Sequence, residues 1–407
     1  MSDFFIARQP IYDRKLYVYA YELLYRSSEN NYADVVDGDD ATSQVLINAL
    51  MEVGLPDLVG QSLAFINLTE RYIVEGLPPS LVQDNLVLEV LEDIEPTEAV
   101  IAGLKKLKAA GHVIALDDFI CDGSKRALVE LADIIKFDLF TLSGSALTEQ
   151  VKKLRSTGIR LLAEKVETPE EYEYCKALGF DYFQGYFFCK PKIVKGTRTL
   201  TSRMAIMQLL TKLQNPELDF SELQALVVQD VSLSYRILRY INSAHFSVGK
   251  KVESIQQAIS LLGLNTIKSW VAILAMSSVD DKPYELILTA LIRARMCEEL
   301  SVNTSVSAEN AFTVGLFSAL DAFIDKSLVD ILDALPLSDA LHHALLNKTG
   351  DLGQILSLVL SYERGQWGDF SATQYDSGTL RTAYLASIRW ADEISDSLIP
   401  KTNVACR

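Results

Sequence analysis

Short apolar runs alternate with amphipathic helical patterns through the first half of the chain. Each run is rich in Val, Ile, Leu and Phe, which is typical of a strand buried on both faces. Between the runs, apolar residues recur at helical spacing, as over Glu98–Ala110 and Glu170–Ala177. The runs predict six buried strands, at Leu63–Asn67, Leu86–Val90, Val113–Asp117, Ile134–Asp138, Arg160–Glu164 and Tyr182–Tyr186. Such an alternation indicates a parallel barrel of the TIM type.

Nearly every predicted strand ends in, or just before, a polar residue. These residues are Asn67, Glu89, Asp117, Lys136 with Asp138, Glu164 and Gln184. In a βα barrel the carboxyl ends of the strands face one mouth, so these side chains should converge there. Taken singly, an asparagine such as Asn67 is more often a turn or cap residue than a ligand. The shared position at the strand ends is what indicates a site.

The pattern changes after about residue 195. Residues 196–201 predict a linker, and the rest of the chain predicts helices with few strand-like runs, for example Ile255–Leu262, Tyr284–Leu300 and Thr379–Ile394. Turn signals such as Lys282-Pro283 separate these helices. We therefore expect a TIM-like α/β barrel over residues 1–195 and an all-α domain over residues 202–407.

Composition supports this division and excludes several classes of partner. A chain of 407 residues with 49% hydrophobic content suits two domains that each bury a core. The net charge of −16 argues against binding to nucleic acid or to anionic lipid, since both need clusters of Lys and Arg. The five cysteines form no CxxC pair, and no signal peptide or apolar run of about 20 residues is found. We expect a cytoplasmic protein with free thiols.

The predicted barrel mouth gathers carboxylates. Glu22, Asp118 and Glu167 join the acidic strand-end residues there. So many carboxylates in one mouth would repel each other unless cations neutralised them. Oxygen ligands favour hard ions such as Mg²⁺ or Mn²⁺, and two such ions can activate water for displacement at phosphorus. The residues alone therefore predict a divalent-metal phosphodiesterase.

Eight segments over residues 4–192 carry a more specific pattern. They are Gln9-Pro10-Ile11, Tyr21–Arg26, Ile66-Asn67-Leu68, Glu89–Glu92, Leu116–Phe119, Ile135–Asp138, Ala163–Glu167 and Gln184-Gly185-Tyr186 with Pro191. In type and order they resemble the motifs of the EAL domain family, with Leu23-Leu24 in place of the Ala-Leu of its signature. That resemblance implies a barrel that opens cyclic di-GMP to the linear dinucleotide pGpG.

The resemblance also implies a role for each matching position. Asp117 would bridge two ions of Mg²⁺ or Mn²⁺, whose implied ligands are Glu22, Asn67, Glu89, Asp117, Asp118 and Glu164. The implied catalytic residues are Lys136, Glu164, Gln184 and Glu167. The implied substrate-binding residues are Arg26, Gln9 and Pro191.

The chain departs from the family pattern in one loop and at one neighbouring position. Ile120–Gly123 stands where the family has Gly-Thr-Gly, and the run from Asp117 to Lys136 is about two residues shorter than the family's. Lys165 replaces a glycine in the segment that follows Glu164. These departures bear on the second ion and on turnover, and less on substrate binding.

The helical half resembles the HDOD domain family. The matching segments are Gln229–Leu233, Arg236–Leu238, Asn242–Phe246, Ile255–Ile259, Leu261–Gly263 and Phe312–Leu316. Related metal enzymes need His-Asp pairs, and none of the four histidines here is followed by Asp. We expect no chemistry in this half. An EAL domain followed by an HDOD domain resembles the YuxH-type family of bacterial signalling proteins, which implies a regulatory or partner-binding role for the helical half.

Two functions stay open at this point. One is a Mg²⁺- or Mn²⁺-dependent cyclic di-GMP phosphodiesterase regulated by its HDOD half. The other is a non-catalytic barrel that acts as a cyclic di-GMP receptor or a protein scaffold. The altered loop favours the receptor, and the retained ligand positions favour the enzyme, which we prefer. A protein partner of the HDOD half and a homodimer are both compatible with the sequence.

Overall fold

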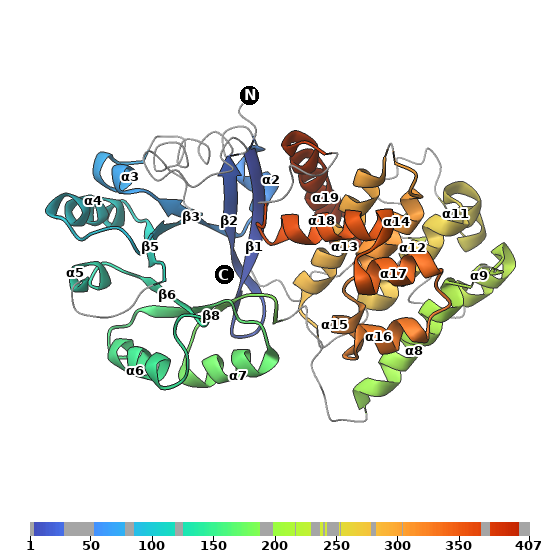
Figure 1. Ribbon diagram of the computed structural model, residues 1–407, viewed down its shortest axis with the longest axis horizontal. Coiled ribbons are helices and arrows are strands. Elements are labelled where there is room, and N and C mark those ends of the chain that lie inside the picture. The colour runs from blue at the N-terminus through green and yellow to red at the C-terminus, as the bar shows by residue number, and fades with distance from the viewer. Residues whose placement is uncertain are drawn as a thin grey trace. The chain divides into compact units, whose positions relative to one another are not determined.

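The structure is a computed structural model of the chain, shown in Figure 1. It describes residues 4–27, 53–77, 85–118, 125–187, 198–215, 217–228, 237–238, 241, 252, 254–277, 282–302, 304–367 and 375–398. The chain divides into two compact units. Unit 1 comprises Met1–Phe188 and Ser361–Thr382, and unit 2 comprises Cys189–Leu360 and Ala383–Arg407. In the described ranges, no helix combines the length and the apolar character that crossing a bilayer requires.

Unit 1 contains a closed barrel of eight strands in chain order (Figure 1). The strands are β1 (Phe4–Asp13), β2 (Val18–Ser27), β3 (Leu63–Leu68), β4 (Leu86–Val90), β5 (Val113–Leu116), β6 (Ile134–Asp138), β7 (Arg160–Glu164) and β8 (Tyr182–Gln184). Neighbours from β2 to β8 are parallel, whereas β1 is antiparallel to both β2 and β8. All six predicted strands are present, and the predicted TIM-like barrel is confirmed.

The apolar runs do not predict β1 and β2. The middle of β1 carries Arg8 and Pro10, and proline cannot donate a hydrogen bond to a strand ladder. Arg8 is nevertheless buried, because its guanidinium donates to the carbonyl of Leu58 over 2.5 Å and lies 4.3 Å from the ring of Tyr21. Arg8 is thus a buried residue of the strand that a search for apolar runs does not detect.

Helices cover the outside of the barrel between successive strands (Figure 1). They are α2 (Leu55–Val59), α3 (Glu70–Glu75), α4 (Glu98–Ala109), α5 (Arg126–Val129), α6 (Gly144–Leu154) and α7 (Pro169–Leu178). Helix α4 buries Val100, Leu104 and Leu107, which share one face at helical spacing. Helix α7 begins at a capping box in which Thr168 and Glu171 bond each other's backbone N–H groups.

The barrel interior contains a layer of apolar side chains, one from each strand. The members of this apolar layer are Ile11, Ala20, Phe65, Val87, Ala115, Ile134, Leu162 and Tyr182. All are buried, so the barrel is filled rather than open through its centre. This layer is the floor on which the residues of the barrel mouth rest.

Unit 2 is helical throughout its described residues, as the sequence predicts. Its helices are α8 (Arg198–Leu213), α9 (Phe220–Val228), α11 (Ile255–Leu262), α12 (Leu264–Ser277), α13 (Tyr284–Ser301), α14 (Ala308–Phe317), α15 (Leu320–Ile324), α16 (Leu328–Asp333), α17 (Asp339–Asn347) and most of α18 (Gly350–Glu363) and α19 (Ser377–Leu398). Helix α13 is buried on nearly every side. Gly315 of α14 lies so close to the backbone of Arg293 and Ala294 that any side chain there would collide with it.

The C-terminal part of the chain returns to the barrel. The sequence predicts a single boundary near residues 196–201, whereas unit 1 also includes Ser361–Thr382. This returning segment carries the last residues of α18 and the first residues of α19. The hydrophobic periodicity of this segment does not distinguish it from the helices around it. The unit against which it packs is decided by side chains that are far away in the sequence.

Aromatic packing attaches the returning segment to β1. Trp367 stacks on Phe5 with 5.6 Å between ring centroids, and its indole N–H donates to the carbonyl of Tyr362. The hydroxyl of Tyr362, which is fully buried, donates over 3.0 Å to the carbonyl of Ile6. Near the end of β8, the hydroxyl of Tyr186 donates to the carbonyl of Glu363. The returning segment is therefore part of the barrel's own core.

Replacing Tyr362 by Phe tests this attachment. The change removes one buried hydroxyl and leaves the carbonyl of Ile6 without that donor, so unfolding of unit 1 should become easier by about 1–3 kcal/mol. The measurement is denaturant unfolding followed by hydrogen exchange of the β1 amides. Tyr17→Phe, at an exposed tyrosine, is the control and should cost less than about 0.5 kcal/mol. Equal effects of the two changes would contradict the assignment.

Candidate functional site

The polar residues of the barrel mouth form a second layer directly above the apolar layer. Side chains two residues apart on a strand lie on the same face. In β3, Asn67 follows Phe65 by two positions, and in β6 Lys136 follows Ile134 in the same way. Strand β1 runs in the opposite direction, so its member precedes Ile11. This polar layer consists of Gln9, Glu22, Asn67, Glu89, Asp117, Lys136, Glu164 and Gln184.

Lys136 lies at the centre of the polar layer with four carboxylates around it. Its Nζ is 2.6 Å from Glu164 Oε1, 3.0 Å from Asp117 Oδ1 and 3.6 Å from Glu22 Oε1, and it donates a hydrogen bond to Glu89. The lysine is 1% exposed and Glu89 is fully buried. The structure thus brings together five predicted site residues, each of which lies on, or directly after, a different strand.

The charges of this cluster depend on each other. Burial by itself would lower the pKa of Lys136, but the four carboxylates together raise it well above its ordinary value. Burial raises the pKa of Glu89 well above its ordinary value, although Lys136 opposes this. Burial also raises the pKa of Glu164 to about 8, with Asp117 and Glu22 adding to the effect and Lys136 opposing it. The lysine is therefore charged at neutral pH, and protons compete with cations for the carboxylates.

Gln184, on β8, forms hydrogen bonds to two other residues of the polar layer, Gln9 on β1 and Glu22 on β2. Its amide nitrogen donates over 2.5 Å to Glu22 Oε2 and over 3.2 Å to Gln9 Oε1. These bonds follow from the register, in which β1 pairs with both β2 and β8. Because Gln184 is buried, it fixes the orientation of the Glu22 carboxylate and leaves the second oxygen of that group facing Lys136.

Several oxygens of the barrel mouth match the needs of a divalent cation. Apart from Asp117 Oδ1, which lies 3.0 Å from Lys136 Nζ, four buried acceptor atoms in the described part of the mouth receive no hydrogen bond, and these are Asn67 Oδ1, Glu89 Oε2, Asp118 Oδ1 and Gln184 Oε1. A carboxylate oxygen from each of Glu89, Asp117 and Glu164 lies within 4.8 Å of the other two. Buried acceptors without donors are costly in a protein alone, and hard cations such as Mg²⁺ or Mn²⁺ bind such oxygens. The residues present therefore fit a divalent metal.

A second, outer group of charges lies beside the polar layer. Asp138, which ends β6, accepts hydrogen bonds from the N–H of Phe140 at 2.8 Å and the hydroxyl of Thr141 at 3.3 Å. The ammonium of Lys165 lies 2.5 Å from the same carboxylate. These three donors lower the pKa of Asp138 against the opposing effect of its burial. The sequence marks Lys165 only as a substitution for glycine and gives no sign of this partner.

The remaining predicted site residues lie outside this geometry. Arg26 belongs to β2, but its side chain is outside the described residues, as are Pro191 and the loop Ile120–Gly123. Glu167 is exposed beyond the end of β7, and its backbone N–H donates to Glu171 at the start of α7. The HDOD-like segments around Asn242–Phe246 also lie outside the described residues.

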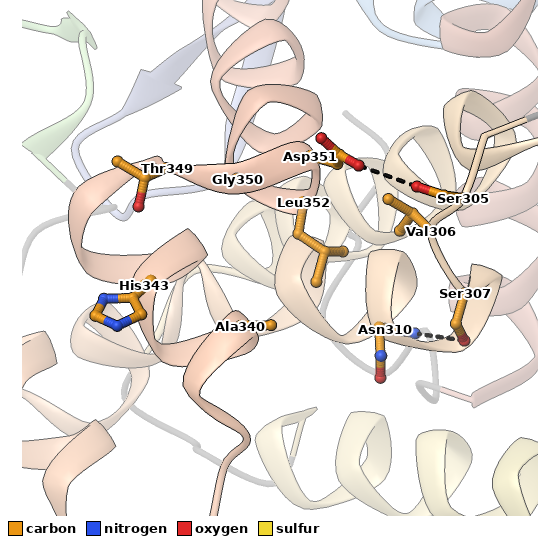
Figure 2. A pocket seen from close by; sticks show the side chains of 10 residues that line it. All are labelled: Ser305, Val306, Ser307, Asn310, Ala340, His343, Thr349, Gly350, Asp351 and Leu352. Carbon is orange, nitrogen blue, oxygen red and sulfur yellow. Dashed lines mark hydrogen bonds between the residues drawn. The ribbon is translucent and has the colours of Figure 1, made fainter.

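Unit 2 contains a cavity of about 430 Å³, shown in Figure 2. Ser305, Ser307 and Asn310 line it from the start of α14, and Asp351 lines it from the start of α18. Much of its polar lining is already engaged, since Ser305 donates to Asp351 and Ser307 accepts from the N–H of Asn310 (Figure 2). His343 lines the cavity from α17 and is exposed. The cavity offers none of the clustered carboxylates found in the barrel.

The raised pKa of Glu164 predicts how the metal-free protein responds to pH. The folded state binds this proton more tightly than the unfolded chain does, because the pKa moves from 4.5 to about 8 on folding. In EDTA, stability should therefore fall as pH rises between these values, by up to about 1.4 kcal/mol per pH unit. Unfolding measured at a series of pH values checks this.

Two matched variants attribute the pH response to one side chain. Glu164→Gln removes this titrating group and should make the dependence of stability on pH smaller, leaving the part that comes from Glu89, whose pKa folding also raises. Glu170→Gln, at an exposed residue of α7, should leave the dependence as it is in the unaltered chain. A Glu164→Gln protein with the full pH dependence would show that another group is responsible.

Comparisons with known proteins agree with the barrel and the helical unit. The EAL domain model matches residues 61–191, and the HDOD domain model matches residues 201–329. The chain is 37% identical over 405 residues to YuxH of Bacillus subtilis, which covers 97% of this chain and 99% of YuxH. It is 31% identical over 405 residues to the cyclic di-GMP phosphodiesterase CdgJ of Vibrio cholerae, which covers 97% of this chain and 94% of CdgJ.

A solved structure of Klebsiella pneumoniae BlrP1, in a complex with manganese and cyclic di-GMP, aligns with 46% of this chain and 55% of BlrP1, at 25% identity and a TM-score of 0.37. A likeness of that size carries no inference about this chain. The two relatives that match along nearly their whole length do. The chain belongs to the family of YuxH and CdgJ, and it carries an EAL domain followed by an HDOD domain.

Proposed function

We propose that the barrel hydrolyses one phosphodiester bond of cyclic di-GMP to give pGpG, with Mg²⁺ or Mn²⁺ as its cofactor. The observation that carries the proposal is the polar layer, in which buried oxygens without hydrogen-bond donors surround a charged lysine. Phosphodiester hydrolysis needs such oxygen ligands for cations, a group that orients water and a base. The similarity to CdgJ along the whole chain supports the choice of nucleotide.

The ligands fall into two overlapping sets. Glu22, Asn67, Glu89 and Asp117 would hold the first ion, and Asp118 and Glu164 would hold the second together with Asp117. The four buried oxygens without donors include atoms of Asn67, Glu89 and Asp118, which supports this assignment. When bound, the ions supply Lewis acidity at the phosphate and lower the pKa of a bound water.

The side chains of the mouth perform the remaining steps. The protonated Lys136 orients the attacking water, and Glu164, with its pKa near neutrality, accepts the proton from that water. The water oxygen bonds to phosphorus while the bond from phosphorus to the 3′ oxygen breaks, and that oxygen leaves as a hydroxyl after taking up a proton.

Other residues of the mouth hold the reacting groups in place. Arg26 would bind the phosphate oxygens, a task that suits a guanidinium. Gln184 keeps Glu22 oriented through its amide and shares that amide with Gln9. Glu167 and Pro191 complete the proposed site at the rim of the barrel.

The helical half is proposed to regulate the barrel. The two units are interleaved in the chain, since Ser361–Thr382 of unit 1 lies between the two segments of unit 2. Helices α18 and α19 each contribute residues to both units. A partner that displaced the unit 2 portion of either helix would therefore act on the contacts of Tyr362 and Trp367 with β1. A protein partner of the HDOD half and a homodimer are both part of this proposal.

A second candidate function is a cyclic di-GMP receptor without turnover. It is favoured by the loop Ile120–Gly123, where the glycines of the family pattern are replaced. Glycine permits tight turns that other residues resist, so the loop bears on whether the second ion can be held. In this case the barrel would bind the nucleotide and the HDOD half would transmit the bound state.

Product analysis separates the two candidates. The purified chain is incubated with cyclic di-GMP and Mn²⁺ or Mg²⁺, and pGpG is measured by chromatography. We expect pGpG to form, and Glu22→Ala to reduce the rate by about 100-fold or more, because a metal ligand is lost. Glu70→Ala, at an exposed residue of α3, is the control. Tight nucleotide binding with no product at high protein concentration would instead support the receptor.

Lys136→Met tests whether the lysine acts in the reaction or only balances charge. Removing a cation from among four carboxylates should leave Mn²⁺ binding as strong as before or stronger. Turnover should nevertheless fall by about 100-fold or more, because the group that orients the water is gone. Calorimetry measures Mn²⁺ binding, and Lys105→Met on α4 is the exposed control. Unchanged turnover would remove Lys136 from the proposed mechanism.

A further inference from the structure

The charges of the barrel mouth are divided unequally between an inner group and an outer group. The inner group is the four carboxyl groups of Glu22, Glu89, Asp117 and Glu164 around Lys136. Its formal charge is −3 once an ion has displaced the protons of Glu89 and Glu164, whose pKa values burial raises. The outer group is Asp118 and Asp138 with Lys165, with a formal charge of −1. A divalent cation is therefore attracted to the inner group more strongly than to the outer group.

Backbone geometry holds Lys165 at this place. Its φ of +54° lies in the left-handed region, which a side chain other than glycine occupies only at a cost. The next residue is fixed to the end of β8, because the N–H of Val166 donates over 3.0 Å to the carbonyl of Gln184. Gly185 has no side chain to collide with the backbone of Val166 in this close approach. These contacts fix the backbone at Lys165, and its flexible side chain reaches Asp138 from there.

Asp118 lies within the electrostatic reach of the same ammonium. Burial and the neighbouring Asp117 raise the pKa of Asp118, and the positive charge of Lys165 opposes this shift. One oxygen of Asp118 is buried, and no described residue donates a hydrogen bond to it. Asp118 is thus an available ligand beside a cation that the protein itself supplies.

We propose that Lys165 is an internal cation of the metal site, which weakens binding of the second divalent ion and so raises the ion concentration at which turnover begins. The proposal rests on the function proposed above and adds a residue to it. A divalent ion held by Asp118 would repel the nearby ammonium, which must then leave Asp138 and move into water. The Lys165 side chain is half exposed, so this movement is open to it.

The consequence is that the two ions bind in separate steps. The first ion binds Glu22, Asn67, Glu89 and Asp117, whereas the described partners of Lys165 are Asp138, Asp118 and Glu164. This first ion supports nucleotide binding. The second ion binds only when its concentration is high enough to displace the lysine. At low divalent concentration the protein then acts as a receptor, and at higher concentration it acts as an enzyme.

A Mn²⁺ titration of the full chain tests the proposal without reference to activity. Free Mn²⁺ is measured by electron paramagnetic resonance, which gives the number of bound ions and the affinity of each step. In the unaltered protein we expect two steps, the second at least about tenfold weaker than the first. Lys165→Met removes the charge and keeps a side chain of similar length, and it should strengthen the second step about tenfold or more while the first step changes less than about twofold.

Three further variants separate charge from conformation. Lys165→Arg keeps the cation and should retain the weak second step. Lys152→Met removes one positive charge, as Lys165→Met does, but at an exposed lysine of α6. It should alter neither step. If relief of the left-handed backbone were the cause, Lys165→Gly would strengthen the second step and Lys165→Met would not.

The possible failures are distinguishable. Absence of any Mn²⁺ binding in the unaltered chain and in Lys165→Met would overturn the proposed metal-dependent function itself. A tight first step with a second step that Lys165→Met leaves unchanged would overturn the role of Lys165 alone. Two binding steps of equal affinity in the unaltered chain would also overturn the role of Lys165 alone.

Discussion

A single buried ammonium group, that of Lys136, makes the barrel mouth possible. Four carboxylates could not be buried at this distance from each other without a cation, because their mutual repulsion in a medium of low polarity is large. The lysine supplies that cation within the chain. It also leaves acceptor oxygens of Asn67 and Glu89 without donors, and these remain available to a divalent ion.

The position of this cluster follows from the period of a β-strand. The apolar layer and the polar layer are two residues apart on each strand, so the residues that fill the barrel also fix the height of the site. This is why much of the site can be predicted from sequence. A polar residue that ends an apolar run, such as Glu89 or Lys136, is visible without any structure. Glu22 and Gln9 are not marked in this way, because the apolar runs do not predict β1 and β2, and β1 carries Arg8 and Pro10. The motifs Tyr21–Arg26 and Gln9-Pro10-Ile11 identify these two residues instead.

Two features of the structure cannot be predicted from the sequence, for a different reason. The return of Ser361–Thr382 to the barrel depends on contacts between residues more than 350 positions apart, such as Tyr362 with Ile6. The pairing of Lys165 with Asp138 depends on the register of β6 against β7, which places Asp138 opposite Glu164. The local sequence pattern indicates the period of each element and the position of turns. It does not indicate which side chains from distant parts of the chain come into contact.

The inner and outer groups of the mouth differ in charge, and the departures from the family pattern concern the outer group. This difference bears on whether the protein is an enzyme or a receptor. The inner ligand set is complete, and its residues come from strand ends whose places the barrel fixes. The departures from the family pattern, Lys165 and Ile120–Gly123, are instead found in the loops that follow β7 and β5. Changes confined to these loops alter the outer group while the inner group keeps its geometry. In the proposed function, binding of a first cation and of a nucleotide would therefore be a property of the barrel, whereas turnover would depend on the loops. One fold would then serve both functions, and the divalent ion concentration would decide between them.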